Sequence, residues 1–123
     1  MPVTVVNLAD KFALFNEHWR PRIVGELNDA YMKVVKVQGE FVWHAHAQED
    51  ELFLVIDGQL RIRLRDGELT LGPGEFVVIP RGVEHQPYAP EEAQLVLLEP
   101  KATTHTGDTA SDLTVAVEQQ EWI

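Results

Sequence analysis

Two histidines and a nearby carboxylate give the first chemical signal in the chain. One residue separates His44 from His46, and Glu51 follows five positions after His46. The apolar run from Phe41 to the histidines predicts an extended segment, in which residues two apart share a face. We therefore expect both imidazoles to project together, with Trp43 on the opposite face, in the core or at an interface. Two imidazoles and a carboxylate from the next strand supply most of a transition-metal site.

A downstream histidine can complete this site. The apolar run that ends at Ile79 predicts a strand, and Pro80 and Gly82 predict a bend before His85. The bend lets His85 approach from a third strand. Three imidazoles and one carboxylate suit Fe(II), Mn(II), Ni(II), Cu(II) or Zn(II), and so many nitrogens disfavour Ca(II). We predict a divalent transition metal as the cofactor, with two of six coordination positions open for O₂, water or a ligand.

The spacing of these residues resembles the two sequence motifs of the cupin family. In the first, His-x-His is followed after four residues by Glu51 and after six more by Gly58; the second has Gly74, Pro80-x-Gly82 and His85. Glu49 and Asp50 adjoin Glu51, but only Glu51 leaves six residues before Gly58. Gly39 lies one position nearer to His44 than is common, and Ala89 replaces a usual asparagine. The resemblance assigns four metal ligands: His44, His46, Glu51 and His85.

Short strands between glycine and proline turns dominate the rest of the chain, with no long helix between them. This pattern is typical of an antiparallel sandwich or barrel. The resemblance implies an all-β fold, a double-stranded β-helix or jelly-roll barrel, with a short N-terminal helix. The helix is predicted over 7–16, capped by Asn7. Strands are predicted over 31–39, 51–57, 60–65, 68–71, 75–79 and 93–99, and 113–118 is either a last strand or a tail.

Length and composition limit the class of protein. We predict one domain over residues 1–123, with a barrel over about 30–100, an extension over 1–29 and a tail over 101–123. No apolar run approaches the ~20 residues of a membrane span, and no signal peptide is evident. The absence of cysteine excludes disulfides and thiolate ligands and fits a cytoplasmic location. The net charge of −10 makes nucleic acid a poor partner.

Several other side chains have two interpretations each. Glu99 either reaches the barrel mouth or is a satisfied buried or strand-end carboxylate, and His105 is predicted to face solvent rather than to cover the pocket. His18 is predicted to be a packing or surface residue. Gln86 and Tyr88 are candidate pocket or supporting groups. Arginines alternate with apolar residues and are predicted to face water or another chain, with anion binding as the alternative: Arg61, Arg63 and Arg65.

The predicted function is a metal-dependent enzyme that acts on a small polar molecule in the barrel. The resemblance implies a dioxygenase or a sugar isomerase or epimerase, in which Glu49 or Asp50 are the candidate bases. Two alternatives stay open: a ligand-binding protein without turnover, and a barrel whose metal is structural. A homodimer is predicted, with the N-terminal segment and Leu113–Val117 as the interface.

Overall fold

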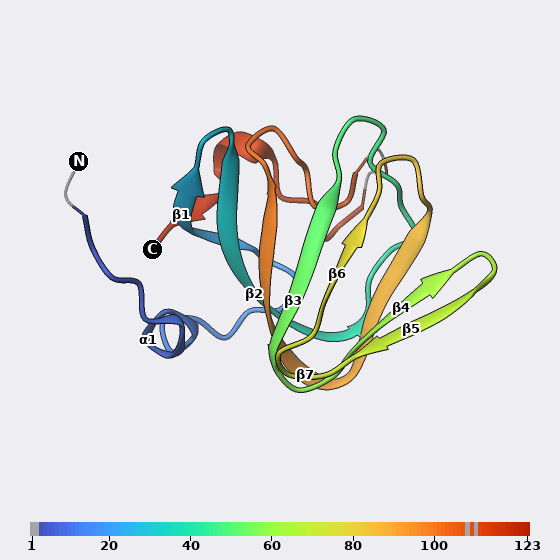
Figure 1. The fold of residues 1–123 in the computed structure, drawn as a ribbon, viewed down its shortest axis with the longest axis horizontal. Helices are drawn as coiled ribbons and strands as arrows, with labels where there is room; N and C mark the ends of the chain where they lie inside the picture. Colours follow the sequence, from blue (N-terminus) through green and yellow to red (C-terminus); the bar gives the residue numbers. More distant parts are fainter. Residues whose placement is uncertain (1–2, 108, 110) are drawn as a thin grey trace.

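The computed structural model, which describes residues 3–107, 109 and 111–123, has two facing layers of β-strands (Figure 1). The all-β jelly roll with a short N-terminal helix is confirmed. The strands run in the order β5-β4-β7-β2-β1-β8, and β3 pairs with β7 and β6. The elements are α1 Leu8–Phe12, β1 Arg22–Leu27, β2 Ala30–Glu40, β3 Glu51–Asp57, β4 Leu60–Leu64, β5 Gly67–Leu71, β6 Phe76–Ile79, β7 His85–Pro100, the 3₁₀ helix η1 Val117–Gln119 and β8 Glu121–Trp122.

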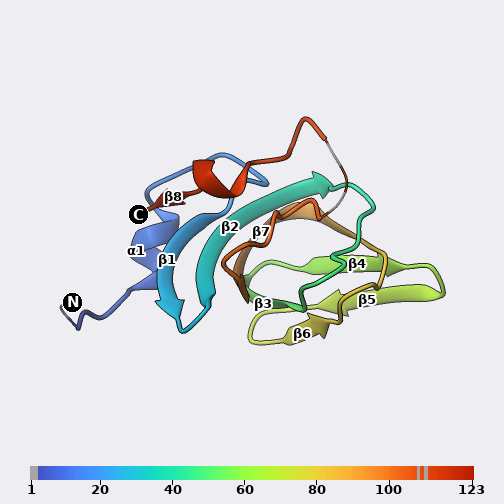
Figure 2. The same cartoon turned by 90° about the horizontal axis from the view of Figure 1, so that it is seen from above.

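The long strand β7 connects the two layers. Its first residues pair with β4, its last residues pair with β3, and β2 pairs with both its halves. In the view from above, β1 and β2 curve over one side while β4, β5 and β6 lie on the other (Figure 2). In the described part of the chain, β5 pairs with β4 and β6 pairs with β3, so the barrel is open between these edge strands.

The alternation predicted for β4 places apolar side chains inside. Leu60 and Ile62 are fully buried, while Arg61 and Arg63 are only half-buried on the other face. The turn before β4 needs a glycine because Gly58 has φ +82° and a Cβ there would lie 2.9 Å from the Cα of Ala93. This turn therefore brings the end of β3 close against β7.

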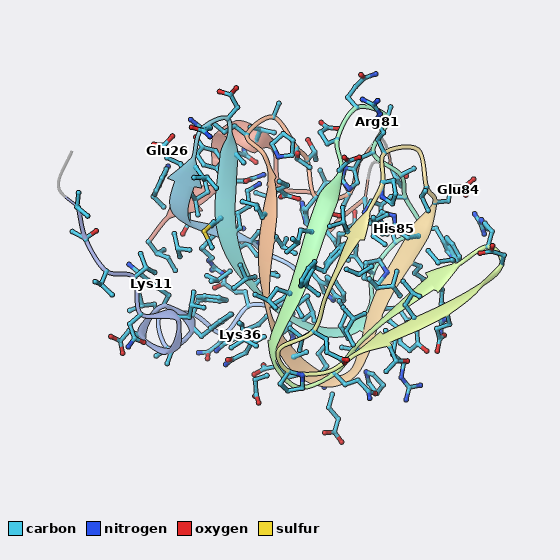
Figure 3. The ribbon with its side chains drawn as sticks, viewed as in Figure 1. Lys11, Glu26, Lys36, Arg81, Glu84 and His85 are labelled. Carbon is cyan, nitrogen blue, oxygen red and sulfur yellow. The ribbon has the colours of Figure 1, made fainter. Side chains whose placement is uncertain are left out.

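The helix α1 covers part of the outside of the sheet. It is shorter than predicted, but Asn7 caps it as expected, with its side-chain oxygen accepting a hydrogen bond from the Asp10 backbone at 3.0 Å. Phe12 and Phe15 are buried in a second apolar cluster on this face. Lys36, labelled near this helix in Figure 3, donates from its ammonium to the Phe15 carbonyl oxygen at 2.7 Å. No helix among the described residues is long and apolar enough to span a membrane.

Two predicted strands differ clearly from the structure. The strand β7 begins at His85 rather than at residue 93, although Pro87 and Pro90 lie in its first half. Pro87 fits because its carbonyl oxygen accepts a hydrogen bond from Phe41, and Pro90 lies where the pairing with β2 shifts register. Of the two interpretations of 113–118, the last strand is not formed. Leu113 packs against the protein's own core and Val115 is buried.

Candidate metal centre and its cavity

The structure brings all four predicted metal ligands together inside the barrel. One donor atom from each of His44, His46, Glu51 and His85 lies within 4.8 Å of the others, and all four side chains are buried. The Oε1 atom of Glu51 is 3.3 Å from Nε2 of His46 and 3.6 Å from Nε2 of His85. Figure 3 shows His85 in the interior, whereas the neighbouring Arg81 and Glu84 point outward.

The connection between β2 and β3 positions the two histidines of the first motif. The segment over 41–46, predicted to be extended, is not part of a regular strand, and His44 forms an isolated bridge with His85. The imidazoles of His44 and His46 nevertheless come together, with ring centroids 5.0 Å apart. The His46 carbonyl accepts a hydrogen bond from Gly82 at 2.8 Å, which ties this connection to the bend of the second motif.

Backbone carbonyl groups fix the orientation of two imidazoles. The Nδ1 atoms of His44 and His85 lie 2.9 Å from the carbonyl oxygens of Val42 and Val83, respectively. A carbonyl can only accept, so each Nδ1 carries the hydrogen and each Nε2 keeps its lone pair. Among the described residues, neither of these Nε2 atoms has a hydrogen-bond partner. Both lone pairs are therefore available to a metal ion.

Burial and neighbouring groups set the charges that a metal site requires. Burial, together with the nearby His85, lowers the pKa of His44 to about 4, so its imidazole is neutral at pH 7. Burial opposes ionisation of Glu51, but the adjacent side chains of Glu99, His46 and His85 hold its pKa well below the usual value. A neutral imidazole and an ionised carboxylate are the states that bind a cation. The donor set fits a divalent transition metal.

Glu99 is a buried neighbour of the ligand Glu51. It is fully buried with Lys33, and the Lys33 ammonium is 2.8 Å from its Oε1. Burial and the adjacent Glu51 charge raise the pKa of Glu99 well above its usual value. The Glu99 carboxyl lies beside Glu51 and favours the ionised form of that carboxylate. Of the interpretations left open by the sequence, Glu99 is a buried carboxyl group, paired with Lys33.

The candidate bases lie outside the four-residue cluster. Asp50 is exposed, and its Oδ1 accepts a hydrogen bond from the Arg81 backbone at 2.9 Å. Glu49 is half-buried on the same loop. This hydrogen bond joins the loop before β3 to the loop after β6. Asp50 therefore holds these two loops together.

The residues that follow His85 face away from the cavity. Gln86 donates to the Phe41 carbonyl at 3.0 Å, and Tyr88 donates to Glu68 at 2.7 Å. Gln86 therefore supports the backbone that leads into the first motif, and neither side chain is part of the cavity lining. His18 contacts Glu92 at the surface as predicted, at 2.7 Å.

The arginines and Trp43 also lie outside the cavity lining. The Arg65 guanidinium lies 3.9 Å above the half-buried Trp43 ring, and Arg63 lies 3.9 Å above Tyr88. Arg63 and Arg65 are already paired with carboxylates of the same chain, Glu40 and Glu84. These pairings favour a structural role over binding of an external anion.

A cavity opens beside the metal cluster. The space open to the centre of a water molecule is about 20 Å³, and all empty space, including the opening to solvent, is about 320 Å³. Three polar side chains reach it, from His44, Glu51 and His105, and the rest of its wall is apolar: Trp19, Pro21, Val35, Val37, Phe41, Phe53, Pro87, Leu95 and Leu97. The prediction that His105 faces solvent is wrong, because only 5% of its surface is exposed.

Sequence reasoning missed two residues of the cavity wall, Trp19 and His105. Trp19 has φ 60°, which is rare for a bulky side chain, and its ring stacks on Phe41 at 4.6 Å. His105 arrives from a polar stretch that follows the last long strand. Neither position has a local pattern that distinguishes it from a surface residue, since both depend on long-range packing.

Comparison with known proteins agrees with this geometry. A family model described as a cupin domain matches residues 31–101. The uncharacterized protein YdbB of Bacillus subtilis is 36% identical over 64 residues, and the match covers 51% of this chain and 57% of that relative. The chain thus spans little more than half the length of this curated relative.

Solved structures of similar proteins share this fold over most of the chain. A cupin-2 domain protein from Shewanella frigidimarina is 55% identical, with a TM-score of 0.77 over 78% of this chain and 94% of that one. Protein NMB1881 from Neisseria meningitidis is 30% identical, with a TM-score of 0.72 over 79% and 99%. KdgF from Halomonas is 26% identical, with a TM-score of 0.56 over 65% and 78%. The family match and these shared folds show that the chain belongs to the cupin family.

Proposed function

We propose that this protein is a metal-dependent enzyme that acts on a small molecule held in the cavity beside the four-residue cluster. One observation carries the proposal. A preformed set of three imidazoles and a carboxylate, buried and in the charge states that bind a cation, opens onto an apolar cavity. A metal ion held by these residues in an apolar wall would be suited to bind and polarise an oxygen atom of a ligand.

Each residue has a separate task in this proposal. His44, His46, Glu51 and His85 hold the metal, which when bound supplies Lewis acidity and open positions for an oxygen ligand. The Val42 and Val83 carbonyls orient two of the imidazoles, and Glu99 keeps Glu51 ionised. The apolar wall excludes water from the reacting group.

Two reaction classes fit this arrangement. A dioxygenase needs open metal positions for O₂ and the substrate. An isomerase or epimerase needs in addition a side chain that moves a proton. Glu49 and Asp50 lie on the loop at the rim, so they remain the sequence-based candidates for that base. Oxygen consumption by the Fe(II)-loaded protein across a panel of small hydroxylated compounds separates the two, since only the dioxygenase consumes O₂.

The test of the proposal is metal content measured by mass spectrometry. Protein purified without a metal-affinity step is expected to contain about one equivalent of Fe, Mn, Ni, Cu or Zn, as one buried site requires. His46→Ala removes a ligand and is expected to lose it, while Gln48→Ala, on the exposed part of the same loop, keeps it. Wild-type protein that stays empty even after reconstitution would leave a ligand-binding barrel without metal chemistry.

A structural role for the metal is the second candidate. The fully buried cluster favours it, since all four side chains have little contact with water. The two roles differ in ligand exchange. In Co(II)-substituted protein, azide is expected to change the visible spectrum if a coordination position is open, and a closed structural site leaves the spectrum unchanged.

We also propose a homodimer, and two groups of apolar side chains outside the core support this proposal. Residues 3–6 extend away from the rest of the chain (Figures 1 and 2), and the Val3 and Val5 side chains are fully exposed. One row of apolar side chains crosses the outer face of four paired strands: Met32, Leu98, Leu52 and Val78. Covering such a row with a second copy buries apolar surface that a monomer leaves in water. The cytoplasmic location stays a prediction from the sequence.

A further inference from the structure

His105 is the buried polar residue that the proposed metal site does not use. It lines the cavity together with His44 and Glu51, although it comes from the segment after β7. Its ring nitrogens approach the backbone of Leu113 and Trp19, but neither nitrogen makes a hydrogen bond of good geometry with the described residues. A buried imidazole without such a partner loses the hydrogen bonds it had with water, which costs stability unless a ligand replaces them.

The segment that carries His105 is fixed in place. The Thr103 backbone donates to the Pro100 carbonyl at 3.0 Å, and the Thr106 and Thr114 hydroxyls are 2.8 Å apart. Gly107 has φ +59° and lies so close to the first motif that a Cβ would be 2.2 Å from the Ala45 carbonyl oxygen. The position of His105 in the wall is therefore built into the fold.

Aromatic rings surround this end of the cavity. The His105 ring is 5.3 Å from the Phe41 ring, which also stacks on Trp19 and meets His44 edge-on at 5.5 Å. Trp19 keeps its rare backbone conformation through two hydrogen bonds, from its backbone to Lys36 and from its indole to Gln38, both 2.9 Å. A strained residue held in this way at a cavity is typical of a binding site.

The wall selects against sugars. A sugar carries a hydroxyl on nearly every carbon, and the nine apolar residues of the wall would leave most of these without partners. Polar groups gather at His44, Glu51 and His105 only. Burial lowers the pKa of His105, which leaves a neutral ring that can both donate and accept a hydrogen bond.

We infer that the cavity binds a small, largely apolar molecule with a pair of oxygen atoms at one end, and that His105 hydrogen-bonds this end while the four-residue cluster holds it. The inference rests on the proposed function, whose substrate class it narrows. In this inference His105 contacts the ligand directly, through a hydrogen bond.

A binding experiment with a single fluorescent reporter tests this inference. The chain has three tryptophans, and Trp43→Phe with Trp122→Phe leaves only Trp19, in the cavity wall. The probe is catechol added to Zn(II)-loaded protein. The controls are 1,2-dimethoxybenzene, which has the same ring but no hydroxyl donors, and glucose. We expect saturable quenching of Trp19 by catechol and little change with either control.

The variants then isolate the histidine. His105→Phe keeps a planar ring against Phe41 and is expected to weaken catechol binding about tenfold, the effect of one lost hydrogen bond. His105→Gln is expected to retain most of the binding. Equal catechol affinity in His105→Phe and wild type, with unchanged melting temperature, would make His105 a packing residue.

The same samples separate this inference from the proposed function. Zinc content is measured in each, and wild-type protein that holds no zinc contradicts the metal proposal itself. Zinc-loaded protein that binds glucose more tightly than catechol, or does not bind catechol, overturns the substrate class alone.

Discussion

The backbones of His44 and His85 exchange two hydrogen bonds, of 3.0 and 2.9 Å, so the two metal motifs are joined by the protein itself. These bonds, with those from each Nδ1 to a carbonyl, involve no metal. The geometry of half of the ligand set is therefore present before an ion binds.

This relationship predicts that metal removal leaves the fold intact. The chelated protein is expected to keep its far-ultraviolet circular dichroism spectrum, because the strands do not depend on the ion. Its melting temperature should fall by on the order of 10 °C when the loaded protein is compared at free metal about a hundredfold above Kd. Complete loss of β-structure on chelation would show instead that the metal drives folding, as in small zinc domains.

The buried pair of Lys33 and Glu99 gives the second prediction. Lys33→Met leaves the Glu99 carboxyl buried without its hydrogen-bond donor, and the free energy of unfolding is expected to fall by about 1–3 kcal/mol in urea titrations. Adding Glu99→Leu should restore much of this loss, since both members of the pair are then apolar. Metal affinity should weaken by roughly 10–100-fold in Lys33→Met, because Glu99 contacts the ligand Glu51.

A matched control removes an exposed ion pair instead. Lys101 contacts Glu26 at the surface, and Lys101→Met is expected to leave both unfolding and metal affinity nearly unchanged. If Lys33→Met were as mild as this control, the buried pair would not support the metal site.

Local patterns were enough to find the three histidines and the acidic run over 49–51, since each motif lies beside a turn that glycines and prolines determine. Glu51 could be chosen over Glu49 and Asp50 only through the family spacing. The residues of the cavity wall were harder to predict from the sequence. Trp19 and His105 reach it through contacts with Phe41, and that packing depends on Gly107 lying against Ala45. A single sequence gives no measure of such long-range contacts. The first half of β7 was missed because its prolines argue locally against a strand, and only its pairing with β2 and β4 shows that it is one.

The lowered pKa of His44 predicts a dependence of stability on pH in the metal-free protein. In the unfolded chain, His44 takes up a proton near pH 6.5, but in the folded protein it does so only near pH 4. This contribution to stability is therefore fully present above pH 6.5 and is lost as the pH falls toward 4, by up to about 3 kcal/mol. Urea unfolding at several pH values measures it. His44→Gln is expected to flatten this part of the profile, and an identical profile in the variant would contradict the assignment.

The proposed dimer predicts a mass about twice the 13.9 kDa of the chain in analytical ultracentrifugation. Phe76 and Val78 are exposed on the edge strand β6, and the double change to lysine is expected to produce monomers. Thr70→Lys, an exposed position on the other edge strand β5, is the control and should remain dimeric. A monomeric wild-type protein would refute the dimer, and a dimeric lysine variant would move the interface elsewhere.

The close contact of Gly107 with the first motif gives the last prediction. In Gly107→Ala, the added methyl would lie 2.2 Å from the Ala45 carbonyl oxygen and 3.3 Å from the His44 ring, so the segment that carries His105 must move away. Gly74→Ala is the matched control, because its φ of +82° imposes a similar backbone penalty, about 1 kcal/mol, with no atom within 4 Å. Gly107→Ala is expected to lose more stability than this control, by a further 1–3 kcal/mol or so. It should also weaken catechol binding, whereas Gly74→Ala should not. Equal losses in the two variants would show that the segment after β7 tolerates displacement and does not fix His105 in the wall.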